Sequence, residues 1–131
     1  MVNVITFGTF DVFHIGHIHI LERAAALGDR LIVGVSSDLL NFSKKNRYPI
    51  YNEEDRIKII SSLKFVDEVF LEESLELKEK YIKEKNANIL VMGDDWKGRF
   101  DQYNNICQVI YFPRTPSIST TEIIEIVKSS R

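Results

Sequence analysis

The sequence has little of what stabilises secreted proteins or anchors membrane proteins. Its 131 residues include one cysteine, Cys107, and a single thiol cannot form an internal disulfide. No apolar run approaches the roughly 20 residues that a membrane-spanning helix needs. The N-terminus also lacks the basic segment and following apolar segment of a secretory signal. These absences predict a cytoplasmic protein with no membrane partner.

An excess of positive charge is also absent. Lys and Arg total 17 against 19 Asp and Glu, for a formal net charge of -2. Proteins that attract nucleic acid or anionic lipid through their overall field carry a basic excess. We therefore expect no nucleic-acid partner, and any phosphate binding must come from a local group of residues.

Two common nucleotide-binding motifs are missing as well. The chain contains neither G-x-G-x-x-G nor G-x-x-x-x-G-K-[ST]. The first binds the pyrophosphate of dinucleotides and the second cradles the phosphates in P-loop enzymes. Their absence argues against hydride transfer and against P-loop hydrolysis.

What the sequence does contain is an alternation of β-rich and helix-periodic segments. Strands are predicted at 2–7, 31–35, 68–71, 89–92 and 108–112, and helices at 16–27, 53–63, 75–85 and 120–127. Segment 41–52 lacks periodicity and is expected to be an exposed, mobile loop. This pattern predicts one domain over residues 1–131, of the α/β class, with a Rossmann-like doubly wound, mainly parallel sheet.

Polar segments follow several of these predicted strands. Gly8-Thr9-Phe10-Asp11 follows the first strand, 93–96 follows the fourth, and 114–121 follows the last. In doubly wound sheets, ligands bind beyond the carboxyl ends of the strands. We therefore expect these segments to meet at one edge of the sheet.

His14 and His17 are the strongest candidates for chemistry. Their spacing places both on one side of a helical turn, where both can donate to oxygens of one polyphosphate. Gly16 between them leaves room for a phosphate beside the backbone. A zinc pair and two incidental surface histidines are the alternatives, and zinc is disfavoured because His19 falls near the opposite helix face and Cys107 has no partner at metal-site spacing.

Other polar residues have both a structural and a functional interpretation. Ser119 and Glu122 fit a capping box, which becomes a phosphate site if it reaches the histidines together with Arg114. The lysines at 44–45 are either solvated charges or part of a lid over a triphosphate. Aspartates 94–95 are either turn formers or ligand contacts.

Asp11 is a candidate for a metal contact. A triphosphate normally arrives with Mg²⁺, and a carboxylate in the first loop could hold that ion directly or through water. The sequence thus predicts Mg²⁺ as the cofactor, with Asp11 beside it.

Two segments together resemble the signatures of the cytidylyltransferase family. These signatures are an HxGH turn, here His14-Ile15-Gly16-His17, and an RTxGISTT-like segment, here RTPSISTT at 114–121. The HxGH turn alone also suits adenylyltransferases, whereas the two signatures in this order are specific, and the similarity extends essentially end to end. The resemblance implies a Mg²⁺-dependent homodimer that transfers CMP from CTP to a small phosphorylated alcohol and releases pyrophosphate.

The resemblance also implies roles for individual residues. His14 and His17 would stabilise the α-phosphate, Lys44 would contact phosphates, and Arg114, Ser119 and Thr120 would hold the β- and γ-phosphates. The nucleotide would be bound by Gly8, Thr9, Phe10, Asp11, Gly93, Asp94, Trp96, Thr115 and Ile118. Arg56 and Asp67 would be supporting polar residues.

The acceptor implied by the resemblance is glycerol 3-phosphate, which would give CDP-glycerol for teichoic-acid or capsule-type polymers. Phosphocholine, phosphoethanolamine, another polyol phosphate, or ATP in place of CTP stay open, as does a nucleotide-binding module without catalysis. Three departures from the family pattern fall mostly on the acceptor pocket. Pro116-Ser117 replaces an acidic-glycine pair, the loop between Lys44 and Arg56 is one residue longer, and Leu75 stands where a tryptophan is expected.

Overall fold

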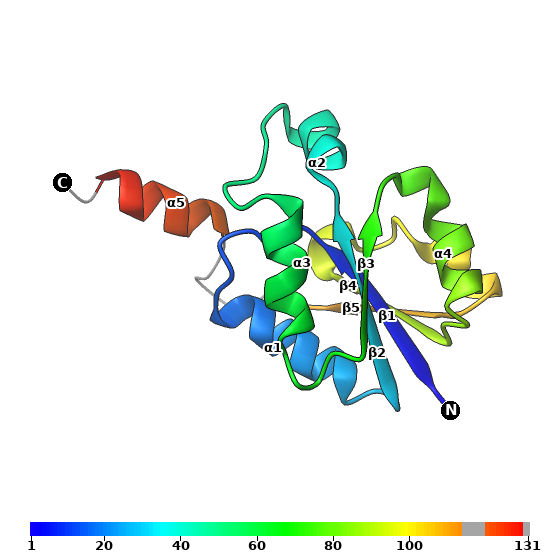
Figure 1. Cartoon of the computed structure of the whole chain (residues 1–131). Coiled ribbons are helices and arrows are strands. Elements are labelled where there is room, and N and C mark those ends of the chain that lie inside the picture. The colour runs from blue at the N-terminus through cyan, green and yellow to red at the C-terminus, as the bar shows by residue number, and fades with distance from the viewer. Residues whose placement is uncertain (114–119, 130–131) are drawn as a thin grey trace.

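The structure, a computed structural model, describes residues 1–113 and 120–129 of the chain. Five strands form one sheet: β1 (Asn3–Gly8), β2 (Arg30–Ser36), β3 (Glu68–Glu72), β4 (Ile89–Gly93) and β5 (Gln108–Phe112). All neighbouring strands are parallel, in the order β3-β2-β1-β4-β5. The predicted doubly wound parallel sheet is therefore confirmed (Figure 1).

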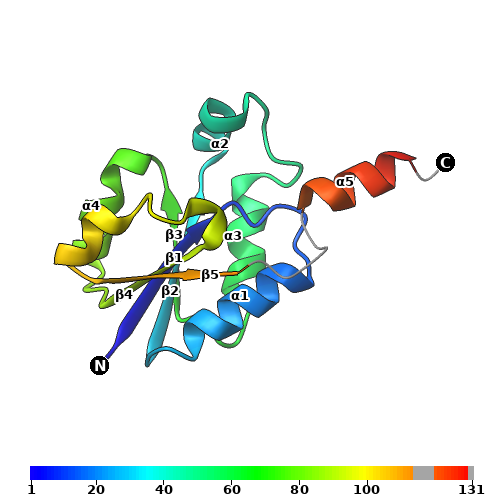
Figure 2. The ribbon, with the colours of Figure 1, turned by 180° about the vertical axis from the view of Figure 1, so that it is seen from behind.

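Helices lie on both faces of this sheet. Helices α1 (Ile15–Ala25) and α3 (Glu53–Ser61) lie on one face, and α4 (Lys78–Glu84) lies on the other (Figures 1 and 2). Short 3₁₀ turns occur as η1 (Leu75–Leu77), η2 (Asp94–Trp96) and η3 (Asp101–Asn105), and α5 (Thr120–Ser129) projects from the body. Within the described ranges, no helix has the length and apolar character needed to cross a membrane.

Two hydrophobic cores result, one on each face. Successive strand residues point to opposite faces, so Val4 and Val91 pack in the core beneath α1 and α3, while Ile5 and Leu90 pack beneath α4. Because both faces are covered, the central strands are apolar at nearly every position, as is usual for parallel sheets. This explains why the predicted strands are continuous apolar runs.

One expected loop is partly helical. Helix α2 (Asp38–Lys45) extends into segment 41–52, and the hydroxyl oxygen of Ser37 caps it by accepting from the backbone N–H of Leu40 (3.0 Å). The helix ends at Asn46 in the left-handed conformation. The expectation of a loop was therefore wrong for the first part of this segment, because the capping serine that starts the helix precedes it.

The strand order places the site. From β1 the chain moves outward through β2 and β3, and it then returns to the other side of β1 to form β4 and β5. Loops on either side of β1 therefore diverge at the carboxyl end of the sheet, and this divergence opens a crevice between them.

Candidate active site

A cleft of about 520 Å³ lies at the carboxyl ends of the strands. Every strand contributes to its lining at its last residues or just beyond: Gly8, Ser36, Glu72, Gly93 and Pro113. The lining also includes the loop after β1 with the start of α1, α2 with the loop after it, η1, η2 and the first turns of α4 and α5. The predicted convergence at one edge is thus present for the segments after β1 and β4, while residues 114–119 of the third segment lie outside the described part of the chain.

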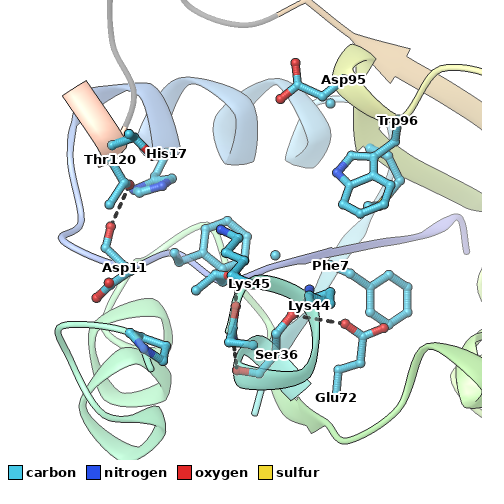
Figure 3. A pocket seen from close by; sticks show the side chains of 18 of the residues that line it. Phe7, Asp11, His17, Ser36, Lys44, Lys45, Glu72, Asp95, Trp96 and Thr120 are labelled. Carbon is cyan, nitrogen blue, oxygen red and sulfur yellow. Dashed lines mark hydrogen bonds between the residues drawn. The ribbon is translucent and has the colours of Figure 1, made fainter. Parts of the chain in front are cut away.

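The cleft brings together most of the residues that the sequence singled out. Its lining includes Gly8, Thr9, Phe10, Asp11, His14, His17, Lys44, Gly93, Trp96 and Thr120. Figure 3 shows His17, Asp11 and Thr120 on one side, Phe7, Glu72 and Trp96 on the other, and the two lysines of α2 between them. The cleft therefore has two ends, which we call the histidine end and the Glu72 end.

Some predicted residues lie elsewhere. Asp94 is exposed and does not line the cleft, whereas Asp95 does. In the single 3₁₀ turn after β4, positions three apart lie on the same side, so Gly93 and Trp96 share the cleft side and Asp94 falls off it. The predicted residues Arg114, Thr115, Ile118 and Ser119 lie outside the described part of the chain. The predicted capping box includes Ser119, so it lies outside that part as well.

His14 and His17 face each other at the start of α1. Nδ1 of His14 accepts from the backbone N–H of Gly16 (3.0 Å), and the backbone N–H of His14 donates to Nδ1 of His17 (3.2 Å). The two rings stack with centroids 3.9 Å apart. A neutral imidazole has one N–H, and since Nδ1 accepts in both rings, the proton is on Nε2. The start of the helix therefore fixes two Nε2–H donors beside the cleft.

His17 is neutral at physiological pH. Burial, and to a smaller extent the neighbouring His14, lowers its pKa from 6.5 to about 3. Two aromatic rings help to bury it: Phe13 stacks on it with centroids 5.3 Å apart, and Phe10 meets it edge-on at 5.6 Å. His17 can therefore act on a phosphate as an oriented hydrogen-bond donor rather than as a cation.

Asp11 lies between two residues with unfavourable backbone angles. Phe10 has φ 55° and Val12 has φ 45°, a region that bulky and β-branched residues rarely adopt. The Asp11 carboxylate holds this loop, because Oδ1 accepts from the backbone N–H of Val12 (3.0 Å) and of Tyr51 (2.8 Å), and Oδ2 accepts from Ile50 (2.7 Å). Asp11 thus ties the loop after β1 to the segment before α3.

These contacts bear on the expected metal. Both carboxylate oxygens of Asp11 already accept backbone N–H groups. In residues 1–113 and 120–129, no three His, Cys, Asp or Glu side chains are grouped so that they could hold a metal ion. Mg²⁺ usually needs only one or two carboxylates when it arrives with substrate phosphates, so Asp11 as a metal contact stays a prediction.

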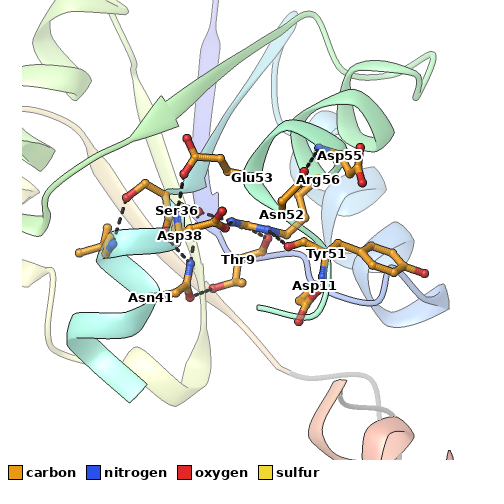
Figure 4. Close-up of polar contacts among 12 residues, drawn as sticks. Thr9, Asp11, Ser36, Asp38, Asn41, Tyr51, Asn52, Glu53, Asp55 and Arg56 are labelled. Carbon is orange, nitrogen blue, oxygen red and sulfur yellow. Dashed lines mark hydrogen bonds and ion pairs between the residues drawn. The ribbon is translucent and has the colours of Figure 1, made fainter. Parts of the chain in front are cut away.

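Arg56 is fully buried behind the cleft. Its guanidinium donates to the backbone carbonyls of Thr9 (2.9 Å), Ser36 (2.8 Å) and Tyr51 (3.0 Å) and to the Asp38 carboxylate (2.7 Å). Figure 4 shows how these contacts join the loop after β1, the end of β2 and the segment before α3. This arrangement suits a supporting residue that positions the walls of the cleft.

The second expected supporting residue, Asp67, lies far from the cleft. Its Oδ2 accepts from the backbone N–H of Leu31 (2.8 Å), and its own N–H donates to the Leu31 carbonyl (2.9 Å). Leu31 is near the amino end of β2, so Asp67 sits at the opposite edge of the sheet. Its contacts here stabilise the pairing of β2 with the start of β3.

Helix α2 is fastened to the loop after β1 by a buried amide. Asn41 accepts from the Thr9 hydroxyl (2.7 Å) through Oδ1, and its Nδ2 donates to the carbonyls of Ser36 (3.2 Å) and Ser37 (2.9 Å). Lys44 follows almost one turn later and lines the cleft. Burial lowers the pKa of Lys44, while the nearby Glu72 opposes that shift.

A buried ion pair forms the Glu72 end of the cleft. Nζ of Lys78 lies 3.0 Å from Oε2 of Glu72, and the two side chains are only 2% and 1% exposed. The Ser36 hydroxyl donates to Oε1 of Glu72 (3.2 Å), and the rings of Phe7 and Phe100 have centroids 3.9 and 4.8 Å from the ammonium. Burial lowers the pKa of Lys78, and Glu72 opposes the shift. Both lysines and Glu72 line the cleft, so an anion in this part of the cleft would meet two ammonium groups and one carboxylate.

At this second end the sequence pointed to Trp96 but not to the buried ion pair. Ser36 and Glu72 could have been found, because each stands at the end of a predicted strand, as Gly8 does. Lys78 and Asn41 gave no such signal, since both lie within helices and face the cleft only through tertiary packing.

Comparisons with known proteins agree with the signatures in the sequence. The cytidylyltransferase-like family model matches residues 5–126. A glycerol-3-phosphate cytidylyltransferase from Bacillus subtilis is 46% identical, with 95% of this chain and 96% of the relative covered, and one from Staphylococcus aureus is 42% identical, with 94% and 92% covered. A crystal structure of a lipopolysaccharide core biosynthesis protein from Thermoplasma volcanium aligns with a TM-score of 0.74 and 31% identity, covering 88% of this chain and 97% of that one.

These matches span nearly the whole chain and include both ends of the cleft. Together with the paired histidines at the point where the strand order reverses, they account for the fold and for the HxGH turn. The chain is a nucleotidyltransferase and belongs to the cytidylyltransferase-like family.

Proposed function

We propose that this protein transfers CMP from CTP to glycerol 3-phosphate, which gives CDP-glycerol and pyrophosphate. The observation that carries the proposal is the pair of Nε2–H donors on His14 and His17, fixed beside the cleft by the start of α1. The relatives named glycerol-3-phosphate cytidylyltransferase, at 42 to 46% identity over nearly the whole chain, support both substrates.

The reaction is a displacement at phosphorus without a covalent enzyme intermediate. A phosphate oxygen of the acceptor forms a bond to the α-phosphorus of CTP. The bond from that phosphorus to the bridging oxygen breaks, and pyrophosphate leaves with the electron pair. The protein contributes position and charge stabilisation, and the Nε2–H groups of His14 and His17 donate to the α-phosphate oxygens as their charge grows.

The two ends of the cleft receive different substrates in this proposal. The triphosphate lies at the histidine end, next to Thr120, whose hydroxyl donates to the Asp11 carbonyl (2.8 Å) and brings the start of α5 to the site. The acceptor phosphate lies beside Lys78 at the Glu72 end, and Lys44, between the two ends, contacts the phosphates of CTP. Contacts from Arg114 to the β- and γ-phosphates stay a prediction.

Mg²⁺ in this proposal travels with the phosphates of CTP, because both carboxylate oxygens of Asp11 already accept backbone N–H groups. Asp11→Asn tests this, because the amide cannot accept three backbone N–H groups as the carboxylate does. We expect the KM for CTP to rise while the Mg²⁺ concentration for half-maximal rate stays within about twofold of wild type. A tenfold higher Mg²⁺ requirement would identify Asp11 as a metal ligand.

A homodimer and a cytoplasmic location also stay predictions. The homodimer rests on the resemblance to the family, and sedimentation equilibrium should give a mass about twice the 15.2 kDa of the chain. The location rests on the lone thiol of Cys107, and fractionation of the source cells tests it.

One assay tests donor and acceptor together. Pyrophosphate release is measured with CTP or ATP against glycerol 3-phosphate, phosphocholine and phosphoethanolamine. We expect the highest kcat/KM for CTP with glycerol 3-phosphate. A higher value with another acceptor would replace the proposed one, and nucleotide binding without turnover on any acceptor would identify a non-catalytic module.

A further inference from the structure

A second hollow adjoins the cleft beside the Glu72 end. It is lined by Leu75, Glu76, Glu79, Gln102 and Tyr103, and we call it the outer hollow. It lies between the start of α4 and η3, which are neighbours in both views of the fold (Figures 1 and 2). Among the residues that the structure describes, Leu75 alone lines both the cleft and the outer hollow.

A row of aromatic rings runs along the same path. The rings of Trp96 and Phe100 have centroids 5.6 Å apart, and those of Phe100 and Tyr103 are 6.4 Å apart and nearly parallel. Trp96 and Phe100 line the cleft, whereas Tyr103 lines the outer hollow. The two spaces therefore share a continuous wall.

The acceptor phosphate would be held at the inner end of this path. Lys78 is the first residue of α4 and directly follows the turn that begins at Leu75. Its ammonium lies 4.8 Å from the centroid of Phe100, the middle ring of the row. An alcohol bound by its phosphate at Lys78 can therefore extend its tail past the half-open side chain of Leu75, which is 38% exposed.

The lining of the outer hollow suits hydroxyl groups. The amide of Gln102 and the hydroxyl of Tyr103 each donate and accept hydrogen bonds, as alcohol hydroxyls do, and the carboxylates of Glu76 and Glu79 accept them. The carboxylates disfavour an anionic tail. Glu79 lies 3.6 Å from the ammonium of Lys83, which offsets one of the two negative charges and leaves mainly that of Glu76.

From this continuity we infer that the outer hollow is a subsite for the acceptor's tail. It admits neutral polyol phosphates longer than glycerol 3-phosphate, and Leu75 is the residue that sets the length admitted. The inference rests on the proposed function, because it needs the acceptor phosphate to lie at Lys78. It names a wider substrate class for the same reaction.

Steady-state pyrophosphate release with saturating CTP tests the inference, with glycerol 3-phosphate and the five-carbon ribitol 5-phosphate as acceptors. We expect the wild-type kcat/KM for the two acceptors to agree within about tenfold. Leu75→Trp should lower kcat/KM for ribitol 5-phosphate at least tenfold more than for glycerol 3-phosphate, because the indole fills the passage. Gln102→Leu should lower the ratio of kcat/KM for ribitol 5-phosphate to kcat/KM for glycerol 3-phosphate, because it removes a hydrogen-bond partner for the tail hydroxyls.

Leu27→Trp is the matched control. Leu27 follows α1 and is exposed to nearly the same fraction, 36%, but it lines neither space. This variant should leave the ratio of the two kcat/KM values unchanged. The thermal midpoint and CTP affinity of Leu75→Trp, measured alongside, separate a blocked passage from a folding defect.

Each outcome decides between the two proposals. Turnover of glycerol 3-phosphate without turnover of ribitol 5-phosphate would overturn the tail subsite and leave the proposed function standing. An equal loss for both acceptors in folded Leu75→Trp would likewise overturn the role of Leu75. Turnover of ribitol 5-phosphate alone would keep the subsite and replace the proposed acceptor, and turnover of neither would overturn both.

Discussion

The two ends of the cleft are built in opposite ways. At the histidine end, Phe10 to His17 supply most of the groups from one short stretch of chain, and the important side chains are neutral donors. At the Glu72 end, Ser36, Glu72 and Lys78 come from two strands and a helix, and two of them are charged and buried. Local sequence therefore specifies the donors that we propose for the reacting phosphate, whereas the packing of distant elements specifies the charge at the proposed site of the second substrate.

The two ends also differ in what destabilises them and in what offsets it: backbone strain at the histidine end and loss of hydration at the Glu72 end. Angles such as those of Phe10 and Val12 cost on the order of 1–3 kcal/mol each, and the hydrogen bonds of the Asp11 carboxylate offset that strain. Lys78 and Glu72 instead lose hydration on burial and compensate each other. Removing one group should thus disturb geometry at the first end and stability at the second.

The largest expected effect is at the Glu72 end. Lys78→Met leaves the Glu72 carboxylate buried without its ion-pair partner, so we expect the free energy of unfolding to fall by about 3–5 kcal/mol. In the double variant Lys78→Met with Glu72→Leu no buried charge remains, and most of that loss should be recovered. Urea denaturation of all three proteins measures both effects, and a double variant no more stable than Lys78→Met would contradict the account of this end.

A smaller free-energy change is expected at the histidine end, and it falls on the rate. His17→Ala removes one oriented donor, so kcat should drop roughly a hundred- to a thousandfold, or about 2.7–4 kcal/mol. His14→Ala should show a similar loss of rate together with about 1 kcal/mol of stability, because its ring also caps α1. The exposed His19 provides the control variant His19→Ala, and near-normal turnover in the His14 and His17 variants would rule out the proposed mechanism.

The depressed pKa of His17 predicts a pH dependence of stability. The unfolded chain binds a proton at this residue below pH 6.5, whereas the folded chain does so only near pH 3. The stabilisation is therefore complete above pH 6.5 and is lost as the pH falls toward 3, at no more than about 1.4 kcal/mol per pH unit. His17→Gln removes the titration, so the difference in free energy of unfolding between wild type and this variant, followed from pH 7 to 5, isolates the effect; a constant difference would mean that His17 is accessible to protons in the fold.

The smallest effect is expected for the lysine between the two ends. Lys44→Ala should raise the KM for CTP about tenfold and change kcat little, because a residue that binds ground state and transition state alike acts on KM. Lys58→Ala, an exposed lysine on α3, is the matched control. Unchanged kinetics in Lys44→Ala would mean that Lys44 is a solvated surface charge with no role in binding CTP.

The fold was predictable from the sequence because each element carries a local pattern. Five apolar runs and the periodic segments between them gave the strands and most helices, with bounds within a few residues. Helix α2 was missed in part because its start depends on one capping residue, Ser37, rather than on an apolar stripe. The sequence did not show which residues of η2 would face the cleft. Asp94 was predicted to line it, whereas the structure places Asp95 there.

The candidate site was predictable only where its residues are close in the chain. His14 and His17 are three positions apart, so helical geometry alone brings them together. Glu72 and Lys78 meet because β3 pairs beside β2 and η1 turns the chain back into α4, which no local pattern contains. The same limit applies to Asp11, whose partners Ile50 and Tyr51 lie about 40 positions away.

The hydrogen bond from the Thr120 hydroxyl to the Asp11 carbonyl joins residues 109 positions apart. A ribosome delivers the chain from its amino end, so the histidine turn emerges early and the wall supplied by α5 emerges more than a hundred residues later. A partly synthesised chain therefore carries the reactive turn without the complete site. If the proposed site is correct, catalytic competence arrives only when residue 120 has left the ribosome and packed against a loop made near the beginning of synthesis.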